Sequence, residues 1–231
     1  MDQASSFKEN GFFTQQLSTA AADQSVADEV TDCYMRVFNA TGEGEWQESW
    51  TKEATLQKLF LDPAADAPRS FLTSWRVNGE LAGFGIAFVD DVDKAVALRD
   101  LPPGLQTQER LDAIRRNLVW LGGKGKLCNY RELGIRREFR SGLAPVLQLI
   151  HDPLEKSATL GAQFSCCWTS RQSRLFPIIS SMDVRMIYDF QDPAGHVLMG
   201  EDVAHACRRF SLPPKEVAVM MRERAAYLQL R

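Results

Sequence analysis

The sequence predicts an α/β fold, and three observations support this prediction. Segments with apolar residues at helical spacing alternate with segments of strand character. Two turn sequences, Asn78-Gly79 and Asp192-Pro193-Ala194-Gly195, each connect a pair of strand-like segments in the way that hairpin turns do. Residues 131–150, RELGIRREFRSGLAPVLQLI, are typical of a strand that leads directly into a helix.

The composition is that of an ordinary globular protein. The chain has 231 residues, of which 45% are hydrophobic and 25% charged, enough to bury a substantial core. A net charge of −3 gives no overall attraction to nucleic acid or to an anionic membrane, so we expect neither as a partner. The sequence has no signal-peptide pattern, no run of eighteen apolar residues, and five cysteines without CxxC spacing, so we expect a cytoplasmic protein.

The first part of the chain predicts a lead-in segment followed by two helices. Residues 1–22 are polar, and we expect a loosely held lead-in or a strand that is added late to the sheet. From Asp23, apolar residues at spacings of three and four predict an amphipathic helix that ends near Thr41. A second helix is expected after Trp50, with Thr51 as its N-cap.

The rest of the chain predicts two hairpins, further strands and several helices. The Asn78-Gly79 turn predicts a hairpin, and the Asp192–Gly195 turn predicts another. A helix-like segment with Leu111, Ile114 and Leu118 on one face lies within an insertion at about 91–126, which ends in the flexible-looking GGKGK. The remaining predicted elements are a strand over 163–169, a short helix capped by Ser173 and a helix from Pro213 to the end of the chain.

Residues 140–145 are suited to binding a phosphate at the start of a helix. Pro145 stands in the first helical turn, where its missing N–H group costs no hydrogen bond. The small residues Ser141, Gly142 and Ala144 would let an anion approach the free backbone N–H groups, which the helix dipole also favours. Arg140 would add a positive charge. The sequence therefore predicts that the main chain binds a pyrophosphate here.

The order of these elements over residues 23–200, together with ELGIRREFRSGLA, resembles the GNAT superfamily of N-acetyltransferases. Its signature is Gln or Arg, two residues, Gly, one residue, then Gly or Ala. Gly142 and Ala144 fill the last two positions, whereas the first falls on Phe139, with Arg140 one position late. The resemblance implies a mixed, mostly antiparallel central sheet of six or seven strands flanked by helices on both faces. It also implies a single acyltransferase-like domain over 23–200, with residues 201–231 as a helical extension packed on it.

The resemblance implies transfer of an acyl group from acetyl-CoA or another acyl-CoA to a small-molecule amine, by direct attack in a ternary complex. Glu132 is the expected general base, and Tyr130 lies on the same strand face. Lys124 or Lys126 would reach the outer phosphate. Backbone groups of the strand and the helix start would hold the pantetheine arm and the pyrophosphate: Leu133, Gly134, Ile135, Arg140, Ser141, Gly142, Leu143 and Ala144.

Other interpretations stay open. The insertion at 91–126 and the basic residues after the strand also resemble N-acyl amino acid and acyl-homoserine lactone synthases, which can use acyl carrier protein. A tyrosine that many family members have on the late short helix is absent from RLFPIISSM, so a catalytically silent acyl-CoA-binding protein is the third hypothesis. The resemblance also allows a homodimer.

Side-chain clusters elsewhere support weaker hypotheses. The acidic, aromatic segment 42–50 would suit a cationic amine at the acceptor site, or is a solvated turn whose tryptophans cover the core. Cys166 and Cys167 are expected to pack as small hydrophobic residues, since no histidine is positioned to activate them. The histidines and cysteines lack recognised metal spacing, so we expect no metal.

Overall fold

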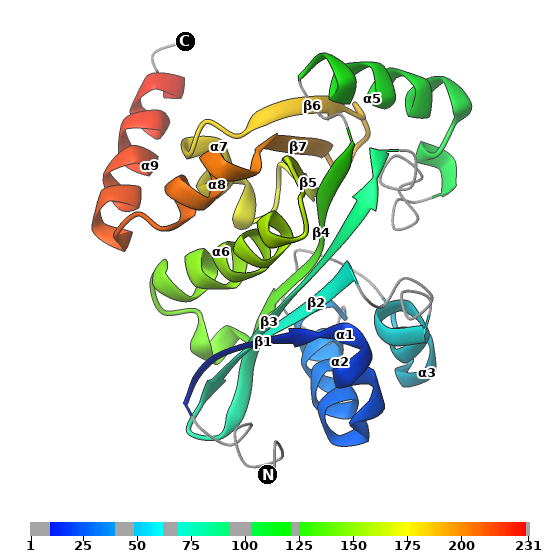
Figure 1. The fold of residues 1–231 in the computed structure, drawn as a ribbon. Helices are drawn as coiled ribbons and strands as arrows, with labels where there is room; N and C mark the ends of the chain where they lie inside the picture. The colour runs from blue at the N-terminus through cyan, green and yellow to red at the C-terminus, as the bar shows by residue number, and fades with distance from the viewer. Residues whose placement is uncertain (1–9, 40–48, 62–68, 93–102, 122–124, 230–231) are drawn as a thin grey trace. The chain divides into compact units, whose positions relative to one another are not determined.

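The structure is a computed structural model that describes residues 10–39, 49–61, 69–92, 103–121 and 125–229. The predicted helix end at Thr41 and the predicted phosphate contact of Lys124 lie outside the described residues. Figure 1 shows the elements in chain order, coloured from blue at the N-terminus to red at the C-terminus.

Strands and helices alternate along the described chain (Figure 1). The strands are β1 (Gly11–Gln16), β2 (Ser70–Val77), β3 (Glu80–Asp91), β4 (Lys126–Ile135), β5 (Phe164–Ser170), β6 (Arg185–Asp189) and β7 (His196–Asp202). The α-helices are α1 (Leu17–Ala22), α2 (Gln24–Phe38), α3 (Lys52–Leu56), α5 (Gln108–Trp120), α6 (Ala144–Thr159), α7 (Leu175–Ser181), α8 (Val203–Phe210) and α9 (Pro214–Gln229). Shorter turns are the π-helix η2 (Gln57–Leu61) and the 3-10 helices η4 (Pro103–Leu105) and η5 (Arg137–Phe139).

The strands form one seven-stranded sheet in the order β1-β2-β3-β4-β5-β7-β6. β1 is antiparallel to β2, and β7 is antiparallel to both β5 and β6, whereas β4 and β5 are parallel. A parallel pair needs a crossover connection, which α6 supplies between these two strands. The predicted α/β fold with a mixed, mostly antiparallel sheet of six or seven strands flanked by helices is confirmed.

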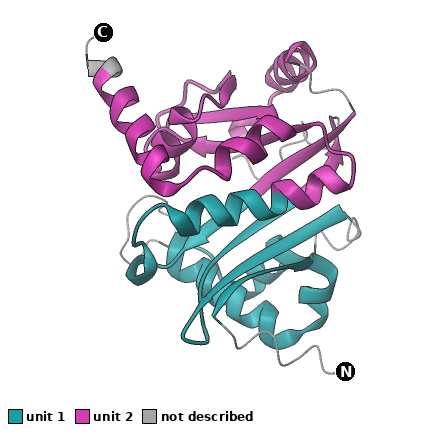
Figure 2. Cartoon of the chain, turned by 60° about the vertical axis from the view of Figure 1, so that its left-hand side comes forward, with its two compact units in different colours: residues 1–87, 132–153 teal, residues 88–131, 154–231 magenta. Residues whose placement is uncertain are grey.

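The chain divides into two compact units (Figure 2). Unit 1 contains residues 1–87 and 132–153, and unit 2 contains residues 88–131 and 154–231. Unit 1 therefore includes the end of β4 and the start of α6, which carry the predicted donor-binding residues.

In unit 1, the predicted helix caps and the predicted hairpin turn are confirmed. The Asp23 side chain caps α2 by accepting hydrogen bonds from the backbone N–H groups of Ser25 and Val26, and Thr51 caps α3 in the same way. Asn78 and Gly79 have φ values of 52° and 79°, as a type I′ hairpin turn requires. Large apolar side chains then fill the core, with less than 2% of each exposed: Leu17, Tyr34, Leu59, Phe60, Leu72, Phe84 and Ile86.

Unit 2 has its own core, formed where α5 packs on the strands. This core consists of Ile114, Leu118, Leu127, Phe164, Cys166, Ile187, Phe190 and Leu198. The predicted hairpin around Gly195 is confirmed, since the Gly195 N–H group donates to the Asp192 carbonyl over 2.9 Å and β6 pairs with β7. The Asn117 side chain also donates to the Ile187 carbonyl over 2.7 Å, so α5 covers the backbone of β6.

The sequence predicted some elements incompletely. Residues 11–22 form β1 and α1, and β1 pairs with β2 along its whole length, from Gly11 to Gln16. Residues 203–210 form α8, which is not predicted separately from the sequence. The cap of α7 is Arg174 and not Ser173, although the Ser173 hydroxyl accepts a hydrogen bond from the Leu175 N–H group. No helix in the described residues is long and apolar enough to cross a membrane.

We predict that Gly200→Ala destabilises the chain, because β7 passes close to its neighbours at this glycine. A Cβ atom at Gly200 would lie 2.7 Å from Cδ1 of Ile187 and 2.9 Å from Cε1 of Phe164, and would also meet the Ser165 carbonyl. Overpacking of this kind costs about 1–3 kcal/mol of the free energy of unfolding, which urea titration measures. Gly104→Ala is the control, since no described residue beyond its chain neighbours lies within 4 Å of its Cβ position. Equal stability of the two variants would contradict the prediction.

Candidate active site

The predicted connection from a strand into a helix is present. β4 ends at Ile135, the single turn η5 follows over Arg137–Phe139, and α6 begins at Ala144. The predicted donor-binding residues 133–135 and 140–144 therefore lie on one continuous segment within unit 1. Eight residues therefore separate the end of β4 at Ile135 from the start of α6 at Ala144.

The amino end of α6 is open at Gly142. Gly142 has a φ of +82°, which favours glycine, and among the described residues beyond its chain neighbours no atom lies within 4 Å of the position that a Cβ would occupy. Ser141, Gly142 and Ala144 are exposed. The backbone N–H groups of Gly142, Leu143 and Ala144 donate no hydrogen bond within the described part of the chain. These residues fit an anion such as a pyrophosphate, because free N–H groups and the helix dipole act together there.

Two of the predicted cations donate hydrogen bonds to backbone carbonyls. The Arg140 side chain is half-buried, and its Nε donates to the Ile135 carbonyl over 2.8 Å, which braces the loop between β4 and α6. Nζ of Lys126 donates to the Leu160 carbonyl over 3.1 Å. This contact places Lys126 just beyond the carboxyl end of α6, whereas Gly142 precedes the amino end of that helix.

Packing in unit 1 leaves no room for a side chain at Gly134. A Cβ at Gly134 would lie 2.7 Å from Cε1 of Phe84, and one at Gly83 would lie 2.8 Å from the Gly134 carbonyl. The two glycines thus allow β3 and β4 to approach closely, and the Arg136 N–H group donates to the Ala82 carbonyl over 2.9 Å. At Gly83 the close neighbour is therefore the backbone of Gly134.

Glu132, the predicted general base, is buried and paired with a lysine. Only 7% of its side chain is exposed, and its Oε1 lies 2.8 Å from Nζ of Lys58. The burial pattern of β4 alternates over Tyr130, Glu132 and Gly134, as expected for residues on one face of a strand. Tyr130 falls in unit 2 and Glu132 in unit 1.

Lys58 lies in an aromatic cage that the sequence did not predict. Its Nζ is 2.6 Å from the Tyr34 hydroxyl and lies over the rings of Tyr34 and Trp50, 4.9 Å and 4.7 Å from their centroids. Asn39 fixes Trp50, because its amide donates to the Trp50 carbonyl over 3.0 Å and accepts from the Trp50 N–H group over 2.8 Å. Lys58 belongs to the π-helix η2, a rare turn often found at functional sites. No sequence motif marks this lysine.

In unit 2, the adjacent cysteines pack as expected. Cys166 is 3% exposed and belongs to the core, and burial raises the pKa of the thiols of Cys166 and Cys167 above the ordinary value. Thiols with raised pKa values are poor nucleophiles at neutral pH. Among the described residues, no group of three or more His, Cys, Asp or Glu side chains is placed to hold a metal ion.

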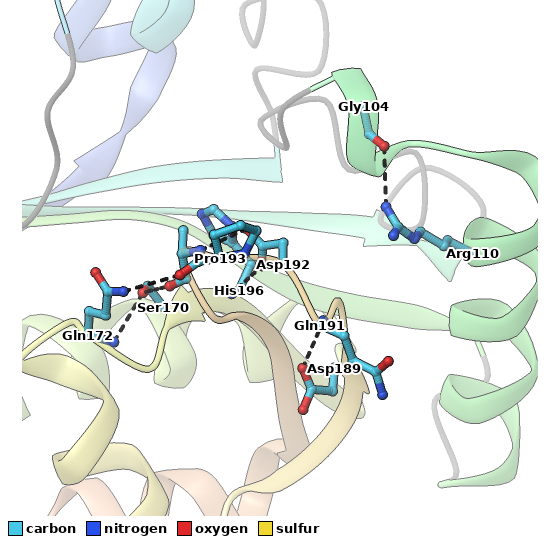
Figure 3. Close-up of polar contacts among 10 residues, drawn as sticks. Gly104, Arg110, Ser170, Gln172, Asp189, Gln191, Asp192, Pro193 and His196 are labelled. Atoms are coloured by element: carbon cyan, nitrogen blue, oxygen red, sulfur yellow. Dashed lines mark hydrogen bonds and ion pairs between the residues drawn. The ribbon is translucent and has the colours of Figure 1, made fainter.

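The turn before β7 organises a histidine and an aspartate (Figure 3). Asp192 accepts hydrogen bonds from both the backbone N–H group and Nδ1 of His196, each over 2.7 Å. Ser170 donates to the Ala194 carbonyl and accepts from the Gln172 N–H group over 3.1 Å. These bonds satisfy the backbone of the turn, so the cluster has a structural explanation.

Glu201 is a second buried carboxylate, at the carboxyl end of β7. It is 5% exposed, and desolvation by burial raises its pKa to about 7, against a smaller opposing effect of Arg209. Oε2 of Glu201 lies 3.5 Å from Nε2 of His205, and Arg209 donates to that same nitrogen over 3.1 Å.

Solved structures share this arrangement of elements. A polyamine N-acetyltransferase from Drosophila melanogaster, an enzyme that forms N-acetylagmatine, matches with a TM-score of 0.53 at 9% identity, covering 83% of this chain and 99% of the other. An agmatine N-acetyltransferase matches with a TM-score of 0.53 at 11% identity and the same coverage. The chain has the GNAT fold. A mosquito arylalkylamine N-acetyltransferase-like protein matches with a TM-score of 0.50 at 12% identity, again covering 83% and 99%.

The structural match to the GNAT fold covers 83% of the chain, whereas the sequence identity to these structures is only 9%, 11% and 12%. No family model and no curated protein matches the sequence. The matched structures confirm the fold that the order of elements predicts, whereas the motif ELGIRREFRSGLA stays a resemblance in sequence.

We predict that Glu201 makes stability depend on pH. Its pKa is higher in the folded chain, about 7, than the ordinary 4.5, so the folded state binds the proton more tightly. The contribution is fully present below pH 4.5 and is lost as the pH rises to about 7, on the order of 3 kcal/mol in total. Urea titrations at several pH values should show this loss, and Glu201→Gln should flatten it. Glu216→Gln, at an exposed position, is the control, and an unchanged profile in Glu201→Gln would contradict the prediction.

Proposed function

We propose that the chain is an acyltransferase that moves an acyl group from acyl-CoA to a small-molecule amine by direct attack in a ternary complex. One observation carries the proposal: the amino end of α6 is open at Gly142, with N–H groups that donate no hydrogen bond within the described residues. The GNAT fold supports it, as do the names of the matched structures, which are amine acetyltransferases.

The segment from β4 to α6 would bind the donor. The N–H groups of Gly142, Leu143 and Ala144 would hold the pyrophosphate, while the backbone of Leu133–Ile135 would hold the pantetheine arm. An N–H group near Ile135 would donate to the thioester oxygen as negative charge develops there. Arg140 would position the loop between β4 and α6, because its Nε donates to the Ile135 carbonyl.

CoA is favoured over an acyl carrier protein as the donor. A carrier protein would need exposed cations near the exit of β4 to bind its acidic surface. Arg136 is already paired, since its guanidinium contacts Glu138 and lies 3.3 Å from a Glu80 carboxylate oxygen. With Arg140 bound to the Ile135 carbonyl, two of the three arginines of this segment have contacts within the chain, and Arg137 is the exposed one.

Glu132 would accept the proton of the attacking amine. A general base must come within hydrogen-bond distance of that amine, so the acceptor would have to approach the carboxylate that Lys58 now contacts. The rings of Tyr34 and Trp50 suit a cationic or aromatic amine at this position. Tyr130, two residues away on the same strand face, is the second candidate for this proton transfer.

The contact with Lys58 also favours a second candidate function, a catalytically silent acyl-CoA-binding protein. A carboxylate that is already paired with an ammonium group is not available as a base until that pair separates. In addition, α7 has no tyrosine to protonate the leaving thiol. Thermal stabilisation by acyl-CoA without thiol release across a broad panel of amines would support this second function.

We predict that Gly142→Glu abolishes donor binding, because a side chain would enter the open space and its charge would repel the pyrophosphate. The affinity for acetyl-CoA, measured by calorimetry, should fall at least about tenfold, or ~1.4 kcal/mol. Gly161→Glu is a matched control, since Gly161 has a φ of +83° and equally open space but follows the carboxyl end of α6. Retained affinity in Gly142→Glu would contradict this placement of the donor.

We predict that Glu132→Gln lowers kcat by about 10²–10⁴ at pH 7 while leaving the affinity for acetyl-CoA nearly unchanged, as expected for loss of a general base. The rate of thiol release with a panel of primary amines measures this effect. Glu138→Gln, an exposed position of the same segment, is the control. Equal rates in Glu132→Gln and in the unmodified chain would remove Glu132 from the mechanism.

A further inference from the structure

The structure places one amine of the chain against the candidate base. Nζ of Lys58 is 2.8 Å from Oε1 of Glu132, a distance at which a general base takes a proton. We propose that Lys58 is itself an acyl acceptor, so that the chain transfers one acyl group from acyl-CoA to Lys58. This inference rests on the proposed function, because the donor must bind at the amino end of α6.

Packing holds the Lys58 ammonium group in one position. The side chain is 12% exposed, and the residues after it, Leu59 and Phe60, are 1% and 2% exposed and anchor η2 in the core of unit 1. Tyr34 contacts the ammonium group through its hydroxyl, and Trp50 contacts it through its ring. An amine that is already positioned beside its base avoids the entropic cost of bringing the two together.

The reaction balances with the groups present and an acyl-CoA donor. The Lys58 ammonium group gives one proton to Glu132 and becomes a neutral amine. The nitrogen lone pair then forms a bond to the thioester carbonyl carbon, and the carbon–sulfur bond breaks. The leaving sulfur takes the second proton from nitrogen, and Glu132 releases its proton to water. The products are an amide on Lys58, free CoA and one proton.

Lys52 provides a comparison within the same part of the chain. Its Nζ lies 2.9 Å from a carboxylate oxygen of Asp28, but 45% of its side chain is exposed and Asp28 is also on the surface. Uncatalysed acylation by a thioester would modify such an accessible lysine more readily than a buried one. Preferential modification of Lys58 would therefore indicate a reaction directed by the structure.

Acylation of Lys58 would have a second, measurable consequence. An amide carries no charge, so the buried carboxylate of Glu132 would lose the ammonium group that it now contacts. Each chain would take up one acyl group at this position, and the modified chain should melt at a lower temperature. Lys58→Gln, which is also neutral, should reproduce the direction of this shift.

The experiment incubates the full chain with acetyl-CoA in the absence of any free amine and maps acetyl groups on each lysine by peptide mass spectrometry over time. We expect Lys58 to be acetylated before Lys52, and Glu132→Gln to slow acetylation of Lys58 about 100-fold. Lys58→Arg should abolish the single rapid acetylation, whereas Lys52→Arg should leave it unchanged. Melting curves of each variant and of the acetylated chain supply the second measurement.

The outcomes separate this inference from the proposed function. If acetyl-CoA binds and free amines are acylated while Lys58 stays unmodified, self-acylation is wrong and the proposed function stands. Acetylation of Lys52 ahead of Lys58, or equal rates in Glu132→Gln, would also overturn the inference. If calorimetry shows no binding of acetyl-CoA to the unmodified chain, both the proposed function and the inference fail.

Discussion

The buried carboxylate of Glu132 sets the main constraint on unit 1. An unpaired charge in the interior of a protein costs several kcal/mol or more, so a carboxylate with 7% of its side chain exposed needs a cation nearby. Lys58 supplies that cation from η2, which places Nζ within 2.8 Å of Oε1. The side chains of Tyr34 and Trp50 lie next to this ammonium group. Two hydrogen bonds from Asn39 hold the backbone of Trp50 in place. The charge pair therefore joins η2 to β4, and α2 contacts the same lysine through the Tyr34 hydroxyl.

A second constraint acts at the end of β4 and in the loop that leads to α6. β4 must come close to β3, and Gly83 and Gly134 make that approach possible without a side chain between the strands. The chain then turns through η5 and Arg140, whose bond to the Ile135 carbonyl braces the loop. Gly142 completes the turn in a conformation that favours glycine, and the N–H groups of residues 142–144 donate no hydrogen bond within the described residues. The open helix end thus follows from how the chain leaves β4.

The sequence predicted the features that depend on neighbouring residues. The caps Asp23 and Thr51, the Asn78-Gly79 turn and the connection from β4 to α6 are local, so their residue types determine them. The pair of Lys58 and Glu132 joins residues 74 positions apart, and no spacing rule connects a π-helix to a strand so distant. Gly134 is predicted to contact the donor through its backbone, and the ring of Phe84 gives a separate, long-range reason why no side chain fits at this position. The polar segment over residues 10–22 gave too weak a periodic signal for β1 and α1 to be predicted firmly.

Within the proposed function, the pair of Lys58 and Glu132 also bears on which acceptors react. Removing one partner of a buried ion pair costs about 3–5 kcal/mol, and each ~1.4 kcal/mol added to a barrier slows a reaction tenfold. A neutral acceptor that displaced Lys58 would meet this cost in full. An acceptor that arrives as an ammonium ion would replace one cation by another between the same rings and beside the same carboxylate, so little of the cost would remain. It would then give its proton to Glu132 only at the moment of attack. The electrostatics of unit 1 thus favour acceptors that are protonated in solution, and they do so through a residue that no donor-binding motif contains.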